Sequence, residues 1–324
     1  MQSGIHAAET SRQRTAPEPA LPRPKRGTLQ IKPRWKKLLT GYAFLSPFLV
    51  LFIVFTVVPV LDSIRLSFTY YNMLEPARFI GLANYRILFL DDDIFFKAIQ
   101  NTFIFSLVTG PVSYMLSFLL AWIINQLRGK SLFAFAFYVP SITSSIALSV
   151  VWLYIFSGDR YGLLNHWLID WGIVSEPVLW VDDAKTILPV VIVVSLWMSM
   201  GTGFLVFLAG LQNVPKELYE AGAIDGVGSK FQELWYITVP FMKPQMLFGA
   251  VNAIVASFGV FDIAVAMAGM PSPNYAGHTI ISHLYDYAFI RFELGYASAI
   301  AVVLFVLTFG LGRIAMKLFS SKDE

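Results

Sequence analysis

The chain carries the stretch LYEAGAIDGVGSKFQELWYITVP at residues 218–240. This stretch is charged and punctuated by glycine and proline, whereas the sequence on both sides of it is strongly apolar. A charged stretch of this kind belongs in water, so it cannot share the environment of its neighbours. The apolar neighbours therefore decide the fold, and the stretch itself is a candidate for contact with another molecule.

The composition is that of a membrane protein. Mean hydropathy is +0.62 and only 14% of the residues are charged, whereas about a quarter are charged in soluble domains. A membrane-spanning helix needs about 20 apolar residues. Six stretches with at most one charge reach that length, and they lie between residues 37 and 62, 97 and 128, 130 and 159, 185 and 216, 243 and 286, and 293 and 313. We therefore expect an all-α integral membrane protein with six transmembrane helices.

The distribution of charge predicts the orientation in the membrane. Six spans place both termini on the same side. In the two tails and the loops 125–130 and 213–243, basic residues outnumber acidic ones, whereas acidic residues predominate in the loops on the opposite side. Because loops rich in Lys and Arg face the cytoplasm, we expect both termini to be cytoplasmic.

Four segments follow from this topology. Residues 1–37 are basic and rich in proline, and we expect a disordered cytoplasmic tail. Residues 38–96 should form the first transmembrane helix and an extracytoplasmic segment at the membrane interface. Residues 97–318 should form the core, with five transmembrane helices and the loop 213–243. Residues 319–324 are a cytoplasmic C-terminal tail. The basic tail accompanies six spans, so we expect no nucleic-acid partner.

The chain lacks the residue patterns of an enzyme or a metal site. It has no cysteine, which excludes disulfides and thiolate ligands. His278 and His283 lie five residues apart, which does not place two ligands on one helical face, so no metal is expected. The glycine-rich residues 226–230 lack the order of a phosphate-binding loop. We expect neither catalysis nor a cofactor in this chain.

The first half of the loop 213–243 predicts a short helix and a turn. Asn213 can cap a helix that has Pro215 at its first position. Leu218, Ala221 and Ile224 then line an apolar face. Asp225-Gly226 is a strong stop signal, because glycine accepts positive φ.

The second half of the loop predicts another short helix. Ser229 and Gln232 have the spacing of a capping box, and we expect the helix that they open to end before Pro240. From these residues alone, the two helices could simply lie on the membrane surface.

The loop also resembles a motif of a known family. Residues 220–226 and 237–240 are similar to the coupling loop of permease subunits in binding-protein-dependent ABC importers, in particular the carbohydrate class of the maltose and oligosaccharide type. Four other segments resemble landmarks of that family in the same order, and they are Gly81–Tyr85, Asn101-Thr102, Tyr138–Pro140 and Phe258–Asp262. The resemblance covers about residues 40–318. Gly222 departs from it, because the family usually has alanine there.

The resemblance implies a type I ABC importer permease fold with a cytoplasmic coupling helix, in the bacterial inner membrane. It implies that this helix docks on a separate ATP-binding subunit dimer, which would hold ATP and Mg. The coupling residues that it implies are Leu218, Glu220, Ala221, Gly222, Ile224, Asp225 and Gly226. The other implied partners are a second homologous permease, an extracytoplasmic substrate-binding protein and the lipid bilayer. The implied substrate is an oligosaccharide, and uronic-acid oligomers such as alginate fragments are the more specific match.

Asp262 is the leading candidate for the substrate pathway. A carboxylate at mid-membrane costs about 3 kcal/mol on insertion scales, so we expect it to face protein or an aqueous cavity. Phe258 lies one turn earlier and is expected on the same face, where its ring could cover the C–H face of a sugar. Asn252 and Trp197 are further candidates. Alternatively, Asp262 only caps a helix or pairs within the bundle.

Two other functional classes remain open. The chain could be an ion-coupled secondary transporter with Asp262 as its coupling carboxylate, or an assembly subunit with no transport path. A second ambiguity concerns Trp167, Trp171 and Trp180 in the loop after the third span. They could form a carbohydrate-stacking surface or a short helix that rests at the water–lipid boundary.

Overall fold

The computed structural model describes residues 33–199 and 201–319, and the chain divides into two compact units, residues 1–56 and 57–324. The described part of the first unit is helical, with α1 (Pro33–Phe52) followed by a π-helical turn, η1 (Ile53–Val57). Residues 33–37 of the expected tail therefore belong to α1. The rest of that tail, and residues 320–324 of the C-terminal one, lie outside the described residues.

The second unit is helical apart from one small hairpin. Strands β1 (Thr69–Tyr70) and β2 (Arg78–Phe79) pair antiparallel, with Thr69 opposite Phe79. The other elements are α2 (Val58–Leu66), α3 (Ala83–Leu90), α4 (Asp93–Asn125), α5 (Lys130–Ile142), α6 (Ser145–Ile155), α7 (Leu163–Asp170), α8 (Ile187–Ser199), α9 (Thr202–Gln212), α10 (Lys216–Ile224), α11 (Lys230–Glu233), η2 (Leu234–Thr238), α12 (Val239–Phe241), α13 (Lys243–Phe258), α14 (Asp262–Ala268), η3 (Pro273–Tyr275), α15 (Ile280–Tyr285), η4 (Asp286–Ile290) and α16 (Leu294–Phe319).

The expected membrane spans are present in the described part of the chain. Five helical stretches are long and apolar enough to cross a membrane: Thr40–Leu66, Asp93–Asn125, Ile187–Gln212, Lys243–Ala268 and Leu294–Lys317. The pair α5 and α6 makes a sixth when it is counted as one broken span. These stretches confirm the all-α class. The span that starts at Asp93 begins before the expected limit of the core at residue 97, because the Asp92 side chain caps α4 by accepting from Phe95 N–H.

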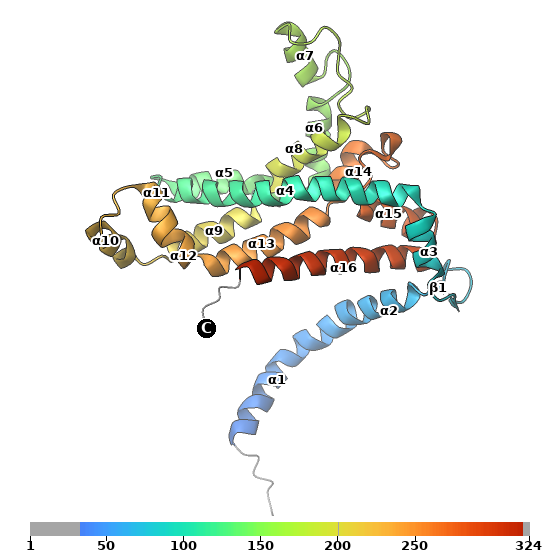
Figure 1. Ribbon diagram of the computed structural model, residues 1–324, viewed down its shortest axis with the longest axis horizontal. Helices are drawn as coiled ribbons and strands as arrows, with labels where there is room; N and C mark the ends of the chain where they lie inside the picture. Colours follow the sequence, from blue (N-terminus) through green and yellow to red (C-terminus); the bar gives the residue numbers. More distant parts are fainter. Residues whose placement is uncertain (1–32, 200, 320–324) are drawn as a thin grey trace, which may run out of the picture. The chain divides into compact units, whose positions relative to one another are not determined.

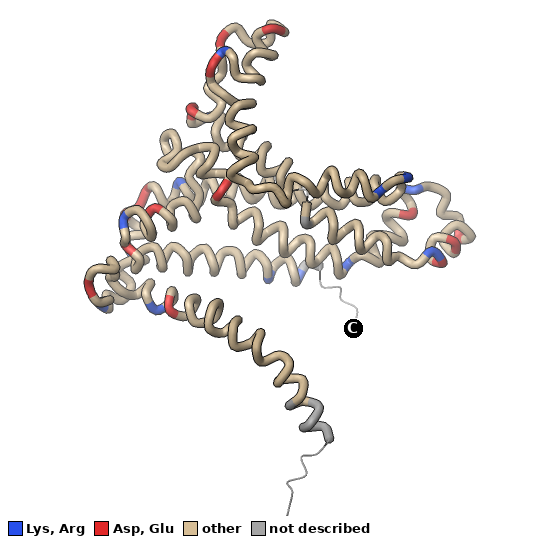
Figure 2. Tube along the Cα trace, turned by 180° about the vertical axis from the view of Figure 1, so that it is seen from behind, with Lys and Arg blue, Asp and Glu red and all other residues tan. Residues whose placement is uncertain are grey.

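Helices α4, α9, α13 and α16 lie side by side in the second unit (Figure 1). The loop elements α10 to α12 lie at one end of this bundle, and α3, β1 and α15 lie at the other. Charged residues gather at these two ends and around α7 (Figure 2). The arrangement follows from the sequence, because the long uncharged stretches leave the bundle little but apolar side chains to present to lipid.

The hairpin before α4 explains one family landmark. The Asn84 amide donates to the carbonyl oxygens of Ser67 and Thr69, at 2.9 Å each, and Tyr85 donates to Ser67 Oγ at 2.8 Å. Gly81 has a φ of +63°, a region that glycine adopts without strain. The Gly81–Tyr85 segment thus holds the C-terminal end of α2 against α3.

The expected third span is broken, because α5 and α6 meet at 94°. Thr143 between them is extended, with ψ 145°. Two causes act together here. Pro140 has no N–H to donate, and Thr143 Oγ1 donates to Val139 O at 2.9 Å while Ser141 Oγ donates to Tyr138 O at 2.8 Å. Such side-chain bonds to the preceding turn compete with the helix and bend it.

Gly201, at the start of α9, lies unusually close to the end of α5. A Cβ atom at this position would collide with Cβ and Oγ of Ser141. The glycine is therefore required for close approach of the two backbones, as small residues commonly are in membrane bundles.

We expect Gly201→Ala to destabilise the fold by about 1–3 kcal/mol, the usual effect of overpacking. The measurement is the melting temperature of the purified protein in detergent. Gly310→Ala is the matched control, because a Cβ at Gly310 meets open space in this chain. The double variant Gly201→Ala, Ser141→Gly should recover stability. The next atom that the added Cβ at position 201 would meet is Ser141 Cα, which lies 3.5 Å from it. Equal melting temperatures for Gly201→Ala and Gly310→Ala would contradict the close approach.

Candidate functional site

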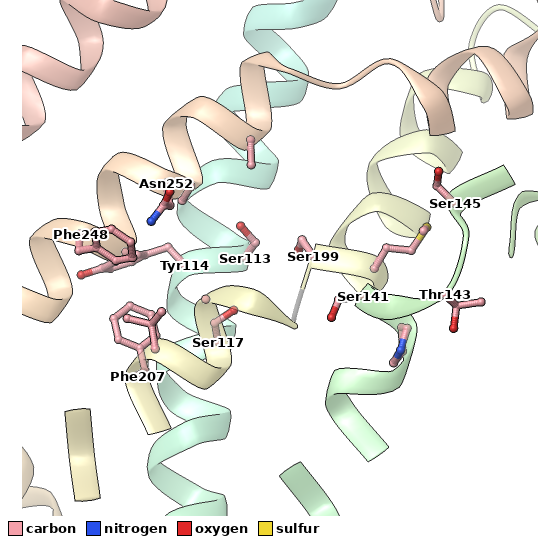
Figure 3. Close-up of a pocket in the computed structure, with 17 residues that line it drawn as sticks. Ser113, Tyr114, Ser117, Ser141, Thr143, Ser145, Ser199, Phe207, Phe248 and Asn252 are labelled. Atoms are coloured by element: carbon pink, nitrogen blue, oxygen red, sulfur yellow. The ribbon is translucent and has the colours of Figure 1, made fainter. Parts of the chain in front are cut away.

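A cavity of about 520 Å³ lies in the middle of the second unit, where α4, α13 and the junctions α5–α6 and α8–α9 meet. Figure 3 shows polar side chains from these elements pointing toward it. The polar residues that line the cavity and are labelled in Figure 3 are Ser113, Tyr114, Ser117, Ser141, Thr143, Ser145, Ser199 and Asn252. Phe207 and Phe248 add aromatic surface on one side. The cavity therefore offers small hydroxyl groups beside aromatic rings.

Most of these hydroxyls already use their hydrogen. Ser113, Ser141 and Ser199 each donate to a backbone carbonyl one turn earlier, at 3.1, 2.8 and 2.9 Å. Their oxygen lone pairs remain available as acceptors. The Asn252 amide lies across the cavity and supplies both N–H donors and an acceptor. This set of groups suits a ligand with many hydroxyls, which can both donate and accept.

Three buried hydroxyls have no partner among the described residues, and two of them, Tyr114 Oη and Ser195 Oγ, belong to residues that line cavities. Leaving a buried polar group unpaired costs about 1–3 kcal/mol. Tyr114 lines the central cavity, and Ser195 lines a second cavity beside it. Both residues therefore stand in a cavity wall with a hydroxyl that is buried and unpaired.

Asp262 lines the second cavity, which has a volume of about 360 Å³. Ser113, Ser145 and Ser199 line both cavities, so the two adjoin. Asp262 is exposed, and its Oδ2 accepts from Ser145 Oγ at 3.3 Å. Among the described lining residues of both cavities, Asp262 is the one that carries a charge.

The expectation that Phe258 shares a face with Asp262 is wrong. The helix breaks between them, because α13 ends at Phe258 and α14 begins at Asp262. Phe258 is buried and packs edge-on against Phe103 at 5.6 Å between ring centroids. It lines a third, apolar pocket among α4, α13 and α16, which shares Tyr114 and Ala253 with the central cavity. The 3.6-residue period on which the expectation depended does not cross the break.

The structure places the other two pathway candidates differently. Asn252 lies in the lining of the central cavity. Trp197 is absent from the lining of both cavities, and its ring packs edge-on against Trp152 at 5.4 Å.

The hydroxyl residues of the cavity were missed by sequence reasoning. The signal was available in Ser113 and Ser117, which lie one turn apart in an uncharged span, and in the Ser/Thr-rich residues 141–145.

The second candidate site is the loop after α9. Its first helix, α10, begins at Lys216 with Pro215 as N-cap and no side-chain cap. The expectation of an Asn213 cap is wrong, because Asn213 ends α9 as its C-cap. The expected turn is present, since Gly226 has a φ of +90° and Val227 N–H bonds to Gly222 O at 2.9 Å.

One face of α10 packs against the rest of the loop and the opposite face is open. Tyr219 Oη bonds to Thr238 Oγ1 at 3.0 Å, and Gly222 is buried. On the open face Leu218 is 41% exposed and Ile224 is 87% exposed. Glu217, Glu220, Ala221 and Ala223 are also exposed. An apolar patch with two flanking carboxylates therefore faces away from the protein.

The departure at Gly222 has a packing reason. A Cβ atom there would lie 2.6 Å from Ile237 Cδ1, a distance at which one of the two must shift. The Ile237 side chain therefore occupies the space that the methyl group of an alanine at position 222 would need.

The second loop helix begins as expected and ends differently. Ser229 and Gln232 form the expected capping box at the start of α11. The expected end before Pro240 is wrong, because the chain continues through the π-helical turn η2 and α12 to Phe241. Pro240 has no N–H for the carbonyl of Tyr236, and a π turn at this place accommodates the missing bond.

The hairpin between α6 and α8 presents two exposed indole rings. Trp167 and Trp171 stack at 6.3 Å with an interplanar angle of 19°. Trp180 differs from them, because its Nε1 donates to Asn165 Oδ1 at 2.9 Å within the hairpin. Asn165 also donates to Ser157 O at 3.0 Å. The buried amide thus holds the hairpin together beneath the exposed pair.

Comparison with known proteins decides the family. The family described as "Binding-protein-dependent transport system inner membrane component" matches residues 113–322. The chain belongs to this family. It is 34% identical over 291 residues to the probable ABC transporter permease protein YesP of Bacillus subtilis (strain 168), covering 89% of this chain and 92% of that protein. These observations identify a multi-pass permease of the inner membrane.

Two further relatives are named as sugar permeases. The arabinooligosaccharides transport system permease protein AraP of Bacillus subtilis (strain 168) is 32% identical, with 89% of this chain and 90% of that protein covered. The lactose transport system permease protein LacF of Rhizobium radiobacter is 30% identical, with 83% and 90% covered. The chain is therefore an ABC importer permease, as its loop motif indicates.

A solved structure supports the fold. A chain from the crystal structure of a bacterial ABC transporter involved in the import of the acidic polysaccharide alginate has a TM-score of 0.75 and 21% identity, and covers 90% of this chain and 99% of that chain. The expected type I permease fold is confirmed by this likeness.

We expect Tyr114→Phe to weaken the response of the assembled importer to its sugar without lowering stability. The hydroxyl has no partner among the described residues, so its removal leaves no buried group unpaired, but a hydrogen bond to substrate is lost. Such a bond contributes about 0.5–1.5 kcal/mol, so half-maximal stimulation of ATP hydrolysis should need up to about tenfold more substrate-loaded binding protein.

Ser106→Ala is the matched control for this prediction. Ser106 Oγ is also buried without a partner among the described residues. Both residues line the apolar pocket with Phe258, but only Tyr114 of the two also lines the central cavity. The control should change neither property. Equal responses of the two variants to substrate would exclude Tyr114 from the binding site.

Proposed function

We propose that this chain is a permease subunit that moves an oligosaccharide through the hydroxyl-lined cavity among α4, the α5–α6 bend, α9 and α13. The observation that carries the proposal is the lining itself, in which acceptor oxygens, unpaired hydroxyls and aromatic rings occur together at the centre of a membrane bundle. Sugar recognition uses the same combination, since hydroxyls require hydrogen-bond partners and C–H faces stack on rings. The names of AraP and LacF support a sugar as substrate.

Transport is driven by subunits that this chain does not contain. The open apolar face of α10, with Leu218, Ala221 and Ile224, fits a groove on an ATP-binding subunit, and Glu220 can pair with a basic residue there. Two such subunits hold ATP and Mg. Asp225 and Gly226 end α10 and set its angle to the following turn. Movement of the ATP-binding subunits then reaches α9 and α13, which flank the loop.

A second permease and a binding protein complete the importer. The second permease closes the cavity from its open side. The binding protein delivers the sugar at the end of the bundle that carries α3 and α15 (Figure 1), where acidic residues predominate. A solved bacterial alginate ABC transporter, in complex with an alginate pentasaccharide-bound periplasmic protein, has a TM-score of 0.75 to this chain and supports such a partner. With α10 in the cytoplasm, both termini are cytoplasmic.

The lining favours a neutral sugar over a uronic-acid oligomer. No Lys or Arg occurs among the described residues that line the two cavities, and Asp262 carries negative charge into one of them. A carboxylate of the substrate accepts hydrogen bonds but does not donate them, and most serines of the lining have already used their hydrogen. Alginate fragments, the more specific expectation, would need basic residues from the second permease.

We expect the charge reversal Glu220→Lys to loosen the ATP-binding subunits. It places a positive charge opposite the basic residue that Glu220 is proposed to contact, and like charges repel at close range. Copurification of the ATP-binding subunits with the permease should fall severalfold, and substrate-stimulated ATP hydrolysis should fall with it.

Glu176→Lys is the control for this charge change. Glu176 is exposed like Glu220 but lies in the hairpin between α6 and α8, so it should leave copurification unchanged. If Glu220→Lys retains full copurification and full coupling, α10 is not the docking helix.

Asp262→Asn separates the proposed importer from an ion-coupled transporter. In the importer, the amide keeps an acceptor for Ser145 Oγ and transport of a neutral oligosaccharide continues within about twofold. In the ion-coupled transporter the coupling carboxylate is lost and accumulation stops. The measurement is ATP-dependent uptake by proteoliposomes that contain the whole importer.

Ser145→Ala is the control for loss of the Ser145–Asp262 hydrogen bond without a change of charge.

The family membership already disfavours the ion-coupled class. Uptake by this permease reconstituted without ATP-binding subunits would contradict the proposed function directly.

A further inference from the structure

A buried chain of hydrogen bonds joins three elements at the end of the bundle opposite α10. His283 Nε2 lies 2.9 Å from Asp92 Oδ2, and His283 Nδ1 lies 3.3 Å from His278 Nε2. Tyr296 Oη donates to the same Asp92 oxygen at 2.6 Å. Asp92 caps α4, His283 is on α15 and Tyr296 is on α16. The two imidazoles, whose spacing does not suit a metal, are 3% and 1% exposed.

The chemistry of the chain fixes where its protons lie. An ionised Asp92 can only accept, so His283 must carry its proton on Nε2. If His283 is neutral, its Nδ1 is an acceptor, and His278 must donate from Nε2. A proton on both rings would place two N–H groups against each other across 3.3 Å. The chain therefore accommodates at most one positive charge on its two histidines.

The same region clamps the outer segment 269–293 onto α4. The Asn101 amide donates to the carbonyl oxygens of Tyr275 and His278, at 2.8 and 2.9 Å. Thr102 Oγ1 accepts from Ile280 N–H at 2.9 Å. Asn101 and Thr102 thus hold the beginning of the segment, and the Asp92–His283 contact holds its helix α15. A proton added to His278 must go to Nδ1, because Nε2 already carries the hydrogen that bonds to His283. It would place a charge on a ring that is only 3% exposed while the segment is clamped, and burial of a charge is costly.

Other titratable groups surround the histidines and are partnered among themselves. Arg291 pairs with Asp286 at 2.8 Å and lies over the Tyr287 ring at 4.4 Å. The Tyr287 ring contacts His283 at 5.0 Å, and the Tyr275 ring contacts His278 at 5.4 Å. Glu293 follows in the same segment. The nearby cation Arg291 opposes a second positive charge at His278, and the carboxylates of Asp286 and Asp92 favour one.

The balance of these effects disfavours protonation of His278. Burial and the neighbouring His283 lower the pKa of His278 from 6.5 to about 4. Burial alone would raise the pKa of Asp92, but hydrogen bonds from His283, Tyr296 and the backbone of Phe95 outweigh it and lower the value to about 2. The clamped segment thus keeps His278 neutral and Asp92 charged.

We propose that the Asp92–His283–His278 chain is an acid-sensitive latch that holds the outer segment 269–293 onto α4 at neutral pH and releases it on acidification. In the clamped state His278 resists protonation, whereas in the released state it takes up a proton with an ordinary histidine pKa. Release therefore gains free energy as pH falls from about 6.5 towards 4. Protonation of Asp92 would add to release only in stronger acid. This role goes beyond the proposed transport function, and its test does not depend on transport.

The test measures amide hydrogen exchange by mass spectrometry on the purified full chain in detergent at several pH values. Exchange of a peptide from α15 is divided by that of a peptide from α16 in the same sample, which cancels the intrinsic effect of pH. In the wild type the ratio should rise roughly ten- to twentyfold between pH 7 and pH 5, as the two pKa values of His278 require.

His278→Gln is the discriminating variant. Glutamine keeps an N–H that can donate to His283 Nδ1 but does not titrate, so the exchange ratio should stay flat over this pH range. His166→Gln is the matched control, because His166 is exposed on α7 and its Nε2 lies 3.6 Å from an exposed Asp170. It should behave as the wild type.

Three results would overturn the latch. The first is a flat ratio in the wild type, which needs no variant and remains decisive if His278→Gln fails to fold. The second is an acid-induced rise in His278→Gln equal to that of the wild type. The third is loss of the rise in His166→Gln.

Discussion

A membrane interior offers no water to bond backbone N–H and C=O groups, and this single constraint organises the whole structure. Helices satisfy these groups internally, so irregular backbone at membrane depth is tolerated only where protein or an aqueous cavity meets it. The chain breaks its helices after α5 and after α13, and the ends of these two breaks line the two adjoining cavities. The breaks and the polar lining are thus one feature.

Packing beneath α10 determines what the loop can present. Tyr219 and Gly222 face inward, where Thr238 and Ile237 meet them. Because these contacts fix the rotation of the short helix, the remaining positions must point outward. An isolated helix of nine residues would be marginal in water. Its stability therefore comes from the packed side, and this leaves the outer side free for a partner.

The predictions that the structure confirms depend on local signals, although the local signal for a cap at Asn213 was misinterpreted. Charges are excluded from spans, so uncharged gaps located the helices, and the capping box at Ser229 depends on residues only three positions apart. Long-range contacts gave no such signal. His283 and Asp92 are separated by 191 residues, and nothing in a five-residue spacing of histidines reveals that partner. The prediction for Phe258 was wrong for a different reason. It extended the helical period across a break that Gly259 and the following residues create.

The core beneath α10 and the lining of the cavity share one residue, Phe207. This residue links movement of the loop to the wall of the cavity. Phe207 of α9 packs in the core with Phe118, and the two rings meet edge-on at 5.4 Å. The same ring contacts Tyr114 at 5.4 Å and lines the cavity. A displacement of α10 transmitted through Tyr219 into this core therefore reaches the cavity wall without any flexible element between them. A close-packed core moves as a unit, so the wall must shift when the loop does.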